Sequence, residues 1–163
     1  RLEEQLVAVH SDAKSKLSLI GWSLGGVYAR EMAKLHPQKV RQVLTLGTPF
    51  AQGPKATNAW RVYEMLSGST VPDEVMQMEI AVAPSVPFTS VYSKSDGIVA
   101  WQASIQAAQK HNSKIENVEV FASHLGIGVN PAAWYVIADR LAQRANEWTP
   151  FAIPDRAKIL FGR

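Results

Sequence analysis

Residues 17–36 read LSLIGWSLGGVYAREMAKLH, and this stretch decides the fold class. Its first residues form a short apolar run typical of a buried strand, which Gly21 ends. From residue 24 to residue 36 apolar side chains return at helical spacing, and Pro37 stops the helix. The expected buried stripe of this helix consists of Val27, Tyr28, Met32 and Leu35. A strand, a tight turn and a helix therefore follow one another, and Ser23 stands at the turn.

The same alternation runs along most of the chain. We expect a helix of about a dozen residues from Leu2, strands at 40–46, 88–92 and 118–121, and a helix at 101–110. Asn130 is a good N-cap with Pro131 at the first helical position of a last helix. The buried face of this helix is expected to carry Trp134, Ile137, Ala138 and Leu141, and no period is visible after Trp148. This order predicts an α/β fold: a mostly parallel sheet with helices on both faces.

Composition and charge predict one globular domain and limit its partners. The chain has 163 residues, of which 47% are hydrophobic and 19% charged, enough for a single core. The net charge is +3, but Lys and Arg are scattered, so we expect no nucleic-acid partner. Apolar runs fall well short of the roughly 20 residues that span a bilayer, so we expect no transmembrane segment. The sequence begins at Arg1 with no recognisable targeting segment, and it leaves the localisation unknown.

Several kinds of chemistry are excluded by what the sequence lacks. There is no cysteine, which excludes disulfides, thiolate zinc sites and a cysteine nucleophile. Histidines and carboxylates show no ligand spacing such as H-E-x-x-H, so we expect no metal site. We expect no other cofactor either.

Residues 21–25 form a G-x-S-x-G motif between the expected strand and helix. This context favours a nucleophile elbow, whereas the plain alternative is a glycine-rich turn with an incidental serine. The elbow is tight, so a side chain at Gly21 or Gly25 would be expected to clash. The helix that follows directs its first amides toward charge developing near Ser23, and the Leu24 N–H is the expected oxyanion donor.

A serine nucleophile needs a base, and His124 is the best placed of the four histidines. It follows the last expected strand, at the carboxyl edge of the sheet, where catalytic groups of α/β proteins collect. The other three have ordinary structural explanations at helix surfaces and helix ends: His10, His36 and His111.

Asp96 is the acid expected to orient His124. It follows the strand at 88–92, again at the carboxyl edge, although an ordinary Asp-Gly turn would be the better explanation if it stood alone. The other acids considered lie in less suitable places, namely an insertion, a strand interior and the last helix: Asp73, Glu119 and Asp139.

The order Ser, Asp, His along the chain and four local motifs resemble the α/β-hydrolase superfamily, and more narrowly bacterial lipases and esterases. The motifs are G-[HW]-S-x-G-G at 21–26, L-G-T-P at 46–49, S-x-x-D-G-x-V at 93–99 and S-H-L-G at 123–126. The resemblance implies an α/β-hydrolase fold with Ser23, Asp96 and His124 as the catalytic residues. It also implies that residues 1–163 form the C-terminal part of one such domain. Strands that precede the elbow strand in the family, and the loop with the second oxyanion donor, are not in this sequence.

That departure leads to two expectations. The strand at 17–20 should expose an apolar edge, because its upstream neighbour is not in the sequence. Residues 1–163 alone should then be poorly soluble or inactive.

Residues 50–87 interrupt the rhythm of the sheet and contain four prolines and three of the four methionines. We expect a helical cap insertion with helices near 58–66 and 72–82, lying over the pocket of Ser23. Trp22, Met76 and Met78 are expected to contact the substrate, since methionine adapts to chains of variable length. In the alternative interpretation, the methionines pack in the insertion's own small core.

The sequence therefore predicts a serine hydrolase that cleaves carboxylic esters, plausibly of lipids, through an acyl-enzyme. Two alternatives stay open. One is a thioesterase or acyltransferase on the same fold, and the other is a non-catalytic binding module.

Overall fold

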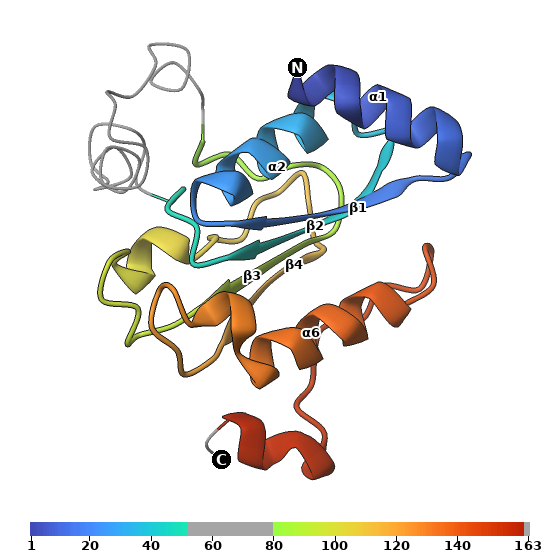
Figure 1. Cartoon of the computed structure of the whole chain (residues 1–163). Coiled ribbons are helices and arrows are strands. Elements are labelled where there is room, and N and C mark those ends of the chain that lie inside the picture. The colour runs from blue at the N-terminus through green and yellow to red at the C-terminus, as the bar shows by residue number, and fades with distance from the viewer. Residues whose placement is uncertain (52–79, 162–163) are drawn as a thin grey trace.

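The computed structural model describes residues 1–51 and 80–161 (Figure 1). Their centre is a four-stranded sheet in the order β1-β2-β3-β4, and every neighbouring pair is parallel. The strands are β1 (Leu17–Trp22), β2 (Val40–Leu46), β3 (Phe88–Tyr92) and β4 (Ile115–Glu119). All four carboxyl ends therefore meet at one edge of the sheet.

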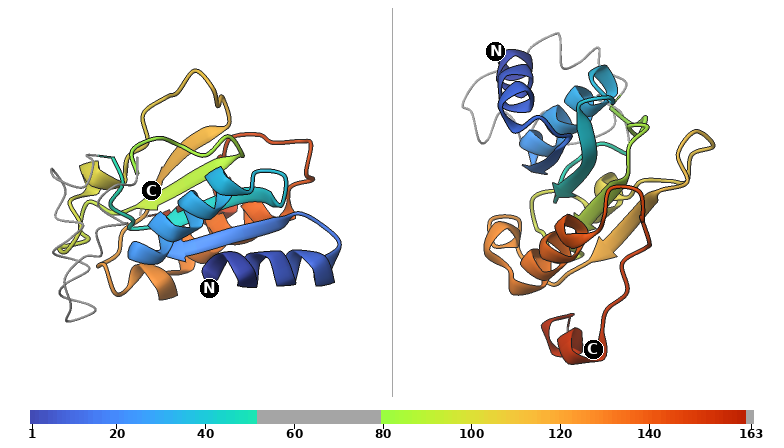
Figure 2. Two further views of the ribbon diagram at one scale, coloured as in Figure 1. Left: turned by 90° about the horizontal axis from the view of Figure 1, so that it is seen from above. Right: turned by 90° about the vertical axis from the view of Figure 1, so that its right-hand side faces the viewer.

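Helices cover both faces of this sheet (Figures 1 and 2). Helices α1 (Leu2–Ala13) and α2 (Leu24–Leu35) lie on one face, and α6 (Pro131–Ala142) lies on the other. Three short 3₁₀ helices complete the described elements: η1 (Trp101–Ser104), η2 (Ile127–Val129) and η3 (Asp155–Phe161). The α/β fold with helices on both faces is thus confirmed.

Each face of the sheet has its own apolar core. The core under α1 and α2 includes Leu6, Ala33, Val43, Phe50 and Phe88. The core under α6 includes Leu44, Val91, Val118, Val136 and Ile137. Val43 and Leu44 are consecutive and point to opposite faces, and both are fully buried. Strands buried on two faces are mainly apolar, and β2 was recognisable by Val40, Val43, Leu44 and Leu46 despite the polar residues between them.

At one end of the sheet β1 has no second partner among the described residues. Ile20 is 44% exposed there, and a groove of about 500 Å³ lies beside it, lined mainly by apolar side chains of α1, β1 and α2. An apolar outer strand was expected from the sequence, and the geometry of β1 agrees with that expectation.

Two predicted elements differ from the structure. The helix expected at 101–110 is only the single turn η1, because Ile105 is extended and the amide of Gln106 donates to Asn117 Oδ1 at 2.8 Å. A tertiary hydrogen bond therefore outweighs local helix propensity. The last strand begins and ends earlier than 118–121, since β4 pairs with β3 from Ile115 to Glu119.

The predicted buried faces of two helices were partly wrong. On α6 the buried residues are Ala132, Ala133, Val136, Ile137 and Arg140, so only Ile137 belongs to the predicted stripe, while Trp134 and Leu141 are exposed. On α2, Val27 is buried as predicted, but Leu35 is exposed and Arg30 is buried. The tail after Trp148, for which no period was visible, forms η3 and packs Ala157 and Phe161 on the core under α6.

The insertion expected at 50–87 lies mainly outside the described residues. The described ends of this segment are held on the body of the domain, since Phe50 and Val86 belong to the core under α2. Residues 80–82, expected to end a helix, form a turn.

Candidate functional site

Ser23 sits on a strained turn between β1 and α2. Its backbone φ is +52° with ψ −127°, a conformation that side-chain-bearing residues rarely adopt. The Ser23 N–H donates to Leu46 O at 2.9 Å, which ties the turn to the end of β2. A Cβ at Gly21 would lie 2.4 Å from Gly25 O, so the first glycine of the motif is required sterically. The same expectation was wrong for Gly25, where a Cβ would meet nothing within 4 Å.

His124 reaches Ser23 from the loop after β4. Its Nε2 lies 3.0 Å from Ser23 Oγ, and both side chains are buried. The backbone of the loop is fixed as well, because the His124 N–H donates to Asp96 O at 2.8 Å. The two side chains lie 101 positions apart in the sequence and meet because β1 and β4 end at the same edge.

Asp96 completes the contact from the loop after β3. Its Oδ2 lies 2.8 Å from His124 Nδ1, and its Oδ1 accepts the amides of Ile98 at 3.0 Å and Val99 at 2.6 Å. One carboxylate oxygen therefore closes the turn, while the other faces the imidazole. Because a carboxylate only accepts hydrogen bonds, this pairing favours the proton on Nδ1 and leaves Nε2 as the acceptor toward Ser23.

The structure thus brings together Ser23, His124 and Asp96, as expected. The arrangement can move a proton from the serine hydroxyl to Nε2 and stabilise the resulting imidazolium with a buried carboxylate. The other histidines lie elsewhere and bond to Ser15 O, Glu3 and Ala83 O, respectively: His10, His36 and His111.

Of the remaining expected site residues, two can be placed. Leu24 is the first residue of α2, and the first amides of a helix have no acceptor within it. Trp22 is 40% exposed, but its Nε1 donates to His124 O at 3.1 Å, and its ring centroid lies 5.6 Å from that of His124. Trp22 therefore braces the histidine loop, a contact that the sequence did not reveal. Met76 and Met78 lie outside the described residues.

Two serines and a glycine near the site were not singled out from the sequence. Ser93 Oγ accepts the Ala122 N–H at 3.1 Å, and Ser95 Oγ donates to Ala122 O at 3.2 Å, so they join the aspartate loop to the histidine loop. Gly47 has a φ of +53°, and a Cβ there would lie 3.0 Å from Asp96 Oδ2. The motifs at 46–49 and 93–99 that contain these residues were recognised in the sequence. Their contacts could not be predicted, because they join loops that lie far apart in the sequence.

Within residues 1–51 and 80–161, His, Asp and Glu side chains do not gather in groups of three that could hold a metal ion. Every helix in the same ranges is too short or too polar to span a membrane.

Comparisons with known proteins point to one superfamily. A family model described as PGAP1-like alpha/beta domain matches residues 4–127. Lipase B of Aspergillus fumigatus has a similar structure, with a TM-score of 0.66 and 17% identity over 99% of this chain and 44% of that one. A monoacylglycerol lipase of Paleococcus ferrophilus has a TM-score of 0.54 and 15% identity over 86% of this chain and 72% of that one. The chain therefore has the esterase- and lipase-like α/β-hydrolase fold.

A shorter match exists at the level of sequence. The pimeloyl-[acyl-carrier protein] methyl ester esterase of Salmonella heidelberg is 38% identical over 47 residues, which cover 29% of this chain and 18% of that esterase. The chain thus spans less than half the length of lipase B, and its match to the curated esterase is shorter still.

Proposed function

The chain belongs to the PGAP1-like α/β domain family, and from that premise we propose that it is a serine hydrolase of carboxylic esters. The observation that carries the proposal is the hydrogen-bonded series from Ser23 Oγ through His124 to Asp96, buried at the carboxyl edge of the sheet. In this proposal Ser23 is the nucleophile, His124 the general base and Asp96 the group that orients His124.

The proposed reaction proceeds through an acyl-enzyme. Ser23 Oγ forms a bond to the ester carbonyl carbon while its proton passes to His124 Nε2. The carbonyl oxygen becomes an oxyanion, for which the Leu24 N–H at the start of α2 is the proposed donor. When the intermediate collapses, the bond to the alcohol oxygen breaks and His124 returns the proton to that oxygen. Water, deprotonated by His124, then releases the acid and restores Ser23.

The names of the similar proteins support carboxylic esters as the proposed substrate class. The Salmonella protein is named for a methyl ester, and two of the similar structures are named as lipases. Lipid esters are therefore part of the proposal. Trp22 has a partly exposed ring beside His124 and is one proposed substrate contact. The other two proposed contacts are Met76 and Met78.

Hydrolysis of p-nitrophenyl butyrate by the full-length enzyme that contains residues 1–163 tests this function, because residues 1–163 alone are expected to be poorly soluble or inactive. We expect a burst of p-nitrophenol equal to the enzyme concentration, and an acyl adduct in the intact mass. Ser23→Ala should lower kcat by roughly 10³-fold or more, because the three residues act as a unit. Ser11→Ala, on the exposed face of α1, is the matched control and should retain the activity. A Ser23→Ala protein with at least a tenth of the activity would require another nucleophile.

A further inference from the structure

The loop that carries His124 is unusually apolar for an exposed surface. Phe121, Leu125 and Val129 are 79%, 64% and 78% exposed, and Trp134 at the start of α6 is 57% exposed. From Val120 to Ala138 the sequence contains no Asp, Glu, Lys or Arg. We call Phe121, Leu125, Val129 and Trp134 the histidine-loop surface. Large exposed apolar patches mark interaction sites, whereas single exposed residues need no explanation.

Hydrogen bonds link the segments that carry Phe121, Val129 and Trp134. Asn130 Nδ2 donates to Phe121 O at 2.9 Å, so the two ends of the loop close on each other. Trp134 Nε1 donates to Gly128 O at 2.9 Å, which places the indole beside Val129. Leu125 directly follows His124. The histidine-loop surface is therefore continuous with the loop that reaches Ser23.

Many polar groups in the backbone of this loop are bonded within the chain. The carbonyl oxygens of Phe121, His124 and Gly128 each accept a bond from a side chain. Amides bonded within the chain are those of Ala122, His124, Gly126, Ile127, Val129 and Asn130. An unsatisfied backbone group is costly in an apolar phase, so this bonding suits a loop that leaves water.

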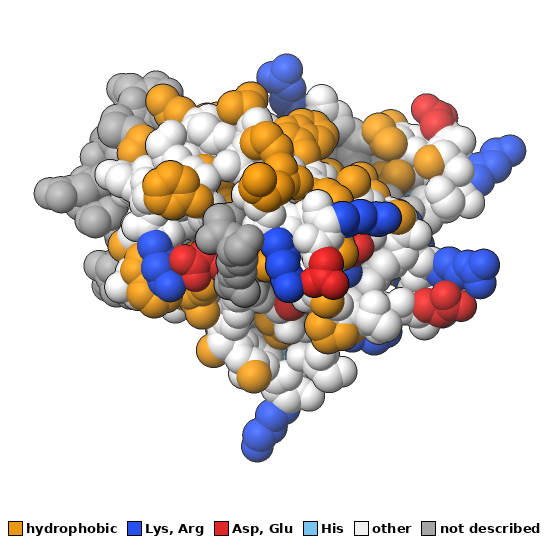
Figure 3. Space-filling view, turned by 90° about the horizontal axis from the view of Figure 1, so that it is seen from below, with side chains coloured by type: hydrophobic (Ala, Val, Ile, Leu, Met, Phe, Trp, Pro, Cys, Tyr) orange, Lys and Arg blue, Asp and Glu red, His pale blue; other side chains and the backbone are white. Residues whose placement is uncertain are grey.

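Charged side chains near this surface come from elements other than the histidine loop. Figure 3 views the molecule from the side of α6 and η3, where hydrophobic side chains gather with both basic and acidic side chains beside them. Among these elements, η3 carries Arg156, which is fully exposed, and Lys158, which is half exposed and paired with the exposed Asp155 at 2.7 Å. A hydrogen bond with Tyr135, the neighbour of Trp134 on α6, raises the pKa of Arg156. An uncharged loop with Arg156 on a neighbouring element, in a chain of net charge +3, complements acyl chains below anionic headgroups.

We propose that the histidine-loop surface docks on a lipid surface and presents Ser23 and His124 to esters within it. This inference rests on the proposed function for its purpose, but the docking is separable from the chemistry. A lipid surface fits better than a protein partner, because protein interfaces have polar rims with about one hydrogen bond per 100–200 Å². The loop offers few free polar groups to such a rim. A tryptophan with its N–H bonded and its ring exposed suits the boundary of a bilayer.

Co-sedimentation with vesicles tests the docking without any turnover. The full-length protein that contains residues 1–163 and carries Ser23→Ala is mixed with vesicles of phosphatidylcholine alone and of phosphatidylcholine with phosphatidylglycerol, and a sample without vesicles is sedimented beside them. We expect binding to both, tighter with the anionic lipid. Adding Phe121→Ser and Val129→Ser should weaken it by at least about tenfold, because two exposed apolar side chains no longer enter the acyl region. Leu35→Ser is the matched control: Leu35 is 61% exposed on α2, on the other face of the sheet, and its loss should leave the binding constant unchanged.

Circular dichroism and gel filtration of each variant accompany the binding curves. A folded Ser23→Ala chain that stays in the supernatant with both vesicles would overturn the proposal. So would a Phe121→Ser, Val129→Ser chain that binds as tightly as its parent. A dimer that becomes a monomer in this variant would assign the surface to a second copy of the chain, again against the proposal. The burst assay in lipid-free buffer reports on the proposed function separately, so a failure there leaves the docking result standing.

Discussion

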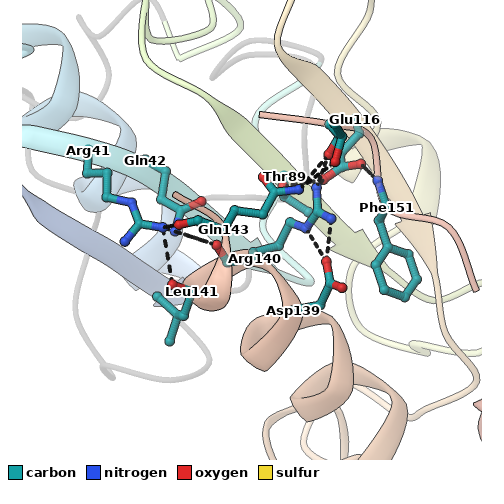
Figure 4. Close-up of polar contacts among 10 residues, drawn as sticks. Arg41, Gln42, Thr89, Glu116, Asp139, Arg140, Leu141, Gln143 and Phe151 are labelled. Atoms are coloured by element: carbon teal, nitrogen blue, oxygen red, sulfur yellow. Dashed lines mark hydrogen bonds and ion pairs between the residues drawn. The ribbon is translucent and has the colours of Figure 1, made fainter. Parts of the chain in front are cut away.

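The two ends of the sheet both hold buried ionisable side chains, but they differ in what those side chains face. At the carboxyl end, Asp96 and His124 lead to the hydroxyl of Ser23. At the amino end, Arg140 lies between Glu116 and Asp139 (Figure 4). Burial and charge are thus common to both ends, and neither property alone marks a reactive site.

At the amino end the hydrogen bonds and ion pairs of Arg140 and Glu116 all go to groups that join elements of the fold. Arg140 Nη1 donates to Glu116 Oε1 at 2.9 Å and to Thr149 O at 2.6 Å, and its Nε donates to Asp139 at 2.9 Å. Glu116 in turn accepts bonds from Thr89 Oγ1 and from the Phe151 N–H. These contacts join β3, β4, α6 and the tail, so the network holds the architecture together.

At the carboxyl end the series of contacts ends at a hydroxyl on a strained turn. Ser23 has its φ at +52°, and its Oγ meets a nitrogen that can take its proton. Strained backbone persists where the surrounding structure determines it, and it concentrates at functional sites. The comparison teaches that strand direction and backbone strain, more than buried charge, identify the candidate site.

The largest effect on kcat is expected when a carboxylate is neutralised at the carboxyl end of the sheet, whereas the same change at the amino end should have none. Asp96→Asn should lower kcat by roughly 10³- to 10⁴-fold, because an amide can donate to Nδ1 and stabilise the wrong tautomer of His124. Asp139→Asn is the same chemical change at the amino end and should leave kcat unchanged. Steady-state kinetics with p-nitrophenyl butyrate measure both. Equal losses in the two variants would contradict the distinction between the ends.

The amino-end network should matter for folding. Arg140→Met should lower the free energy of unfolding by roughly 3–5 kcal/mol, since it leaves Glu116 buried without its cation. Arg144→Met removes an exposed arginine near the end of the same helix, whose contact to Glu147 is 3.5 Å, and should change stability little. Urea unfolding followed by circular dichroism gives both values. An unfolding free energy for Arg140→Met close to that of Arg144→Met would mean that the network is dispensable.

The smallest effect is expected at the brace of the histidine loop. Trp22→Phe keeps an aromatic ring beside His124 but removes the bond from Nε1 to His124 O, so kcat should fall roughly three- to tenfold at similar stability. Trp148→Phe is the control, because Trp148 Nε1 is buried without a hydrogen-bond partner in the described part of the chain. A KM effect without a kcat effect would contradict the bracing role and leave Trp22 only its proposed role as a substrate contact.

Most of the fold and the central site could be predicted from the sequence because their signals are local. The strands at 40–46 and 88–92 are rich in apolar and β-branched residues and end at turn residues, and Asn130 with Pro131 marks the start of α6. Ser23, Asp96 and His124 each follow a strand, and parallel strands bring such positions to one edge. The same reasoning could not place Met76 or Met78.

What failed depends on contacts between distant segments. Arg30 reads as a surface residue of α2, yet its guanidinium lies over the rings of Phe50 and Phe88. It donates to Ile80 O, Val82 O and Gln106 Oε1. Burial lowers the pKa of Arg30 to about 9. The partners lie 20 to 76 positions away in the sequence, so no local pattern predicts them. The lost helix after η1 has the same origin, since Gln106 bonds to Arg30 and Asn117.

Labelling of the folded full-length protein that contains residues 1–163 with a fluorophosphonate, followed by peptide mapping, tests the central claim most directly. The reagent bonds covalently to an activated serine and needs no knowledge of the substrate. The account predicts one adduct, on the peptide that contains Ser23, which disappears in Ser23→Ala and is strongly reduced in His124→Ala. A folded chain that takes up no reagent, or an adduct on another serine that persists in Ser23→Ala, would contradict it.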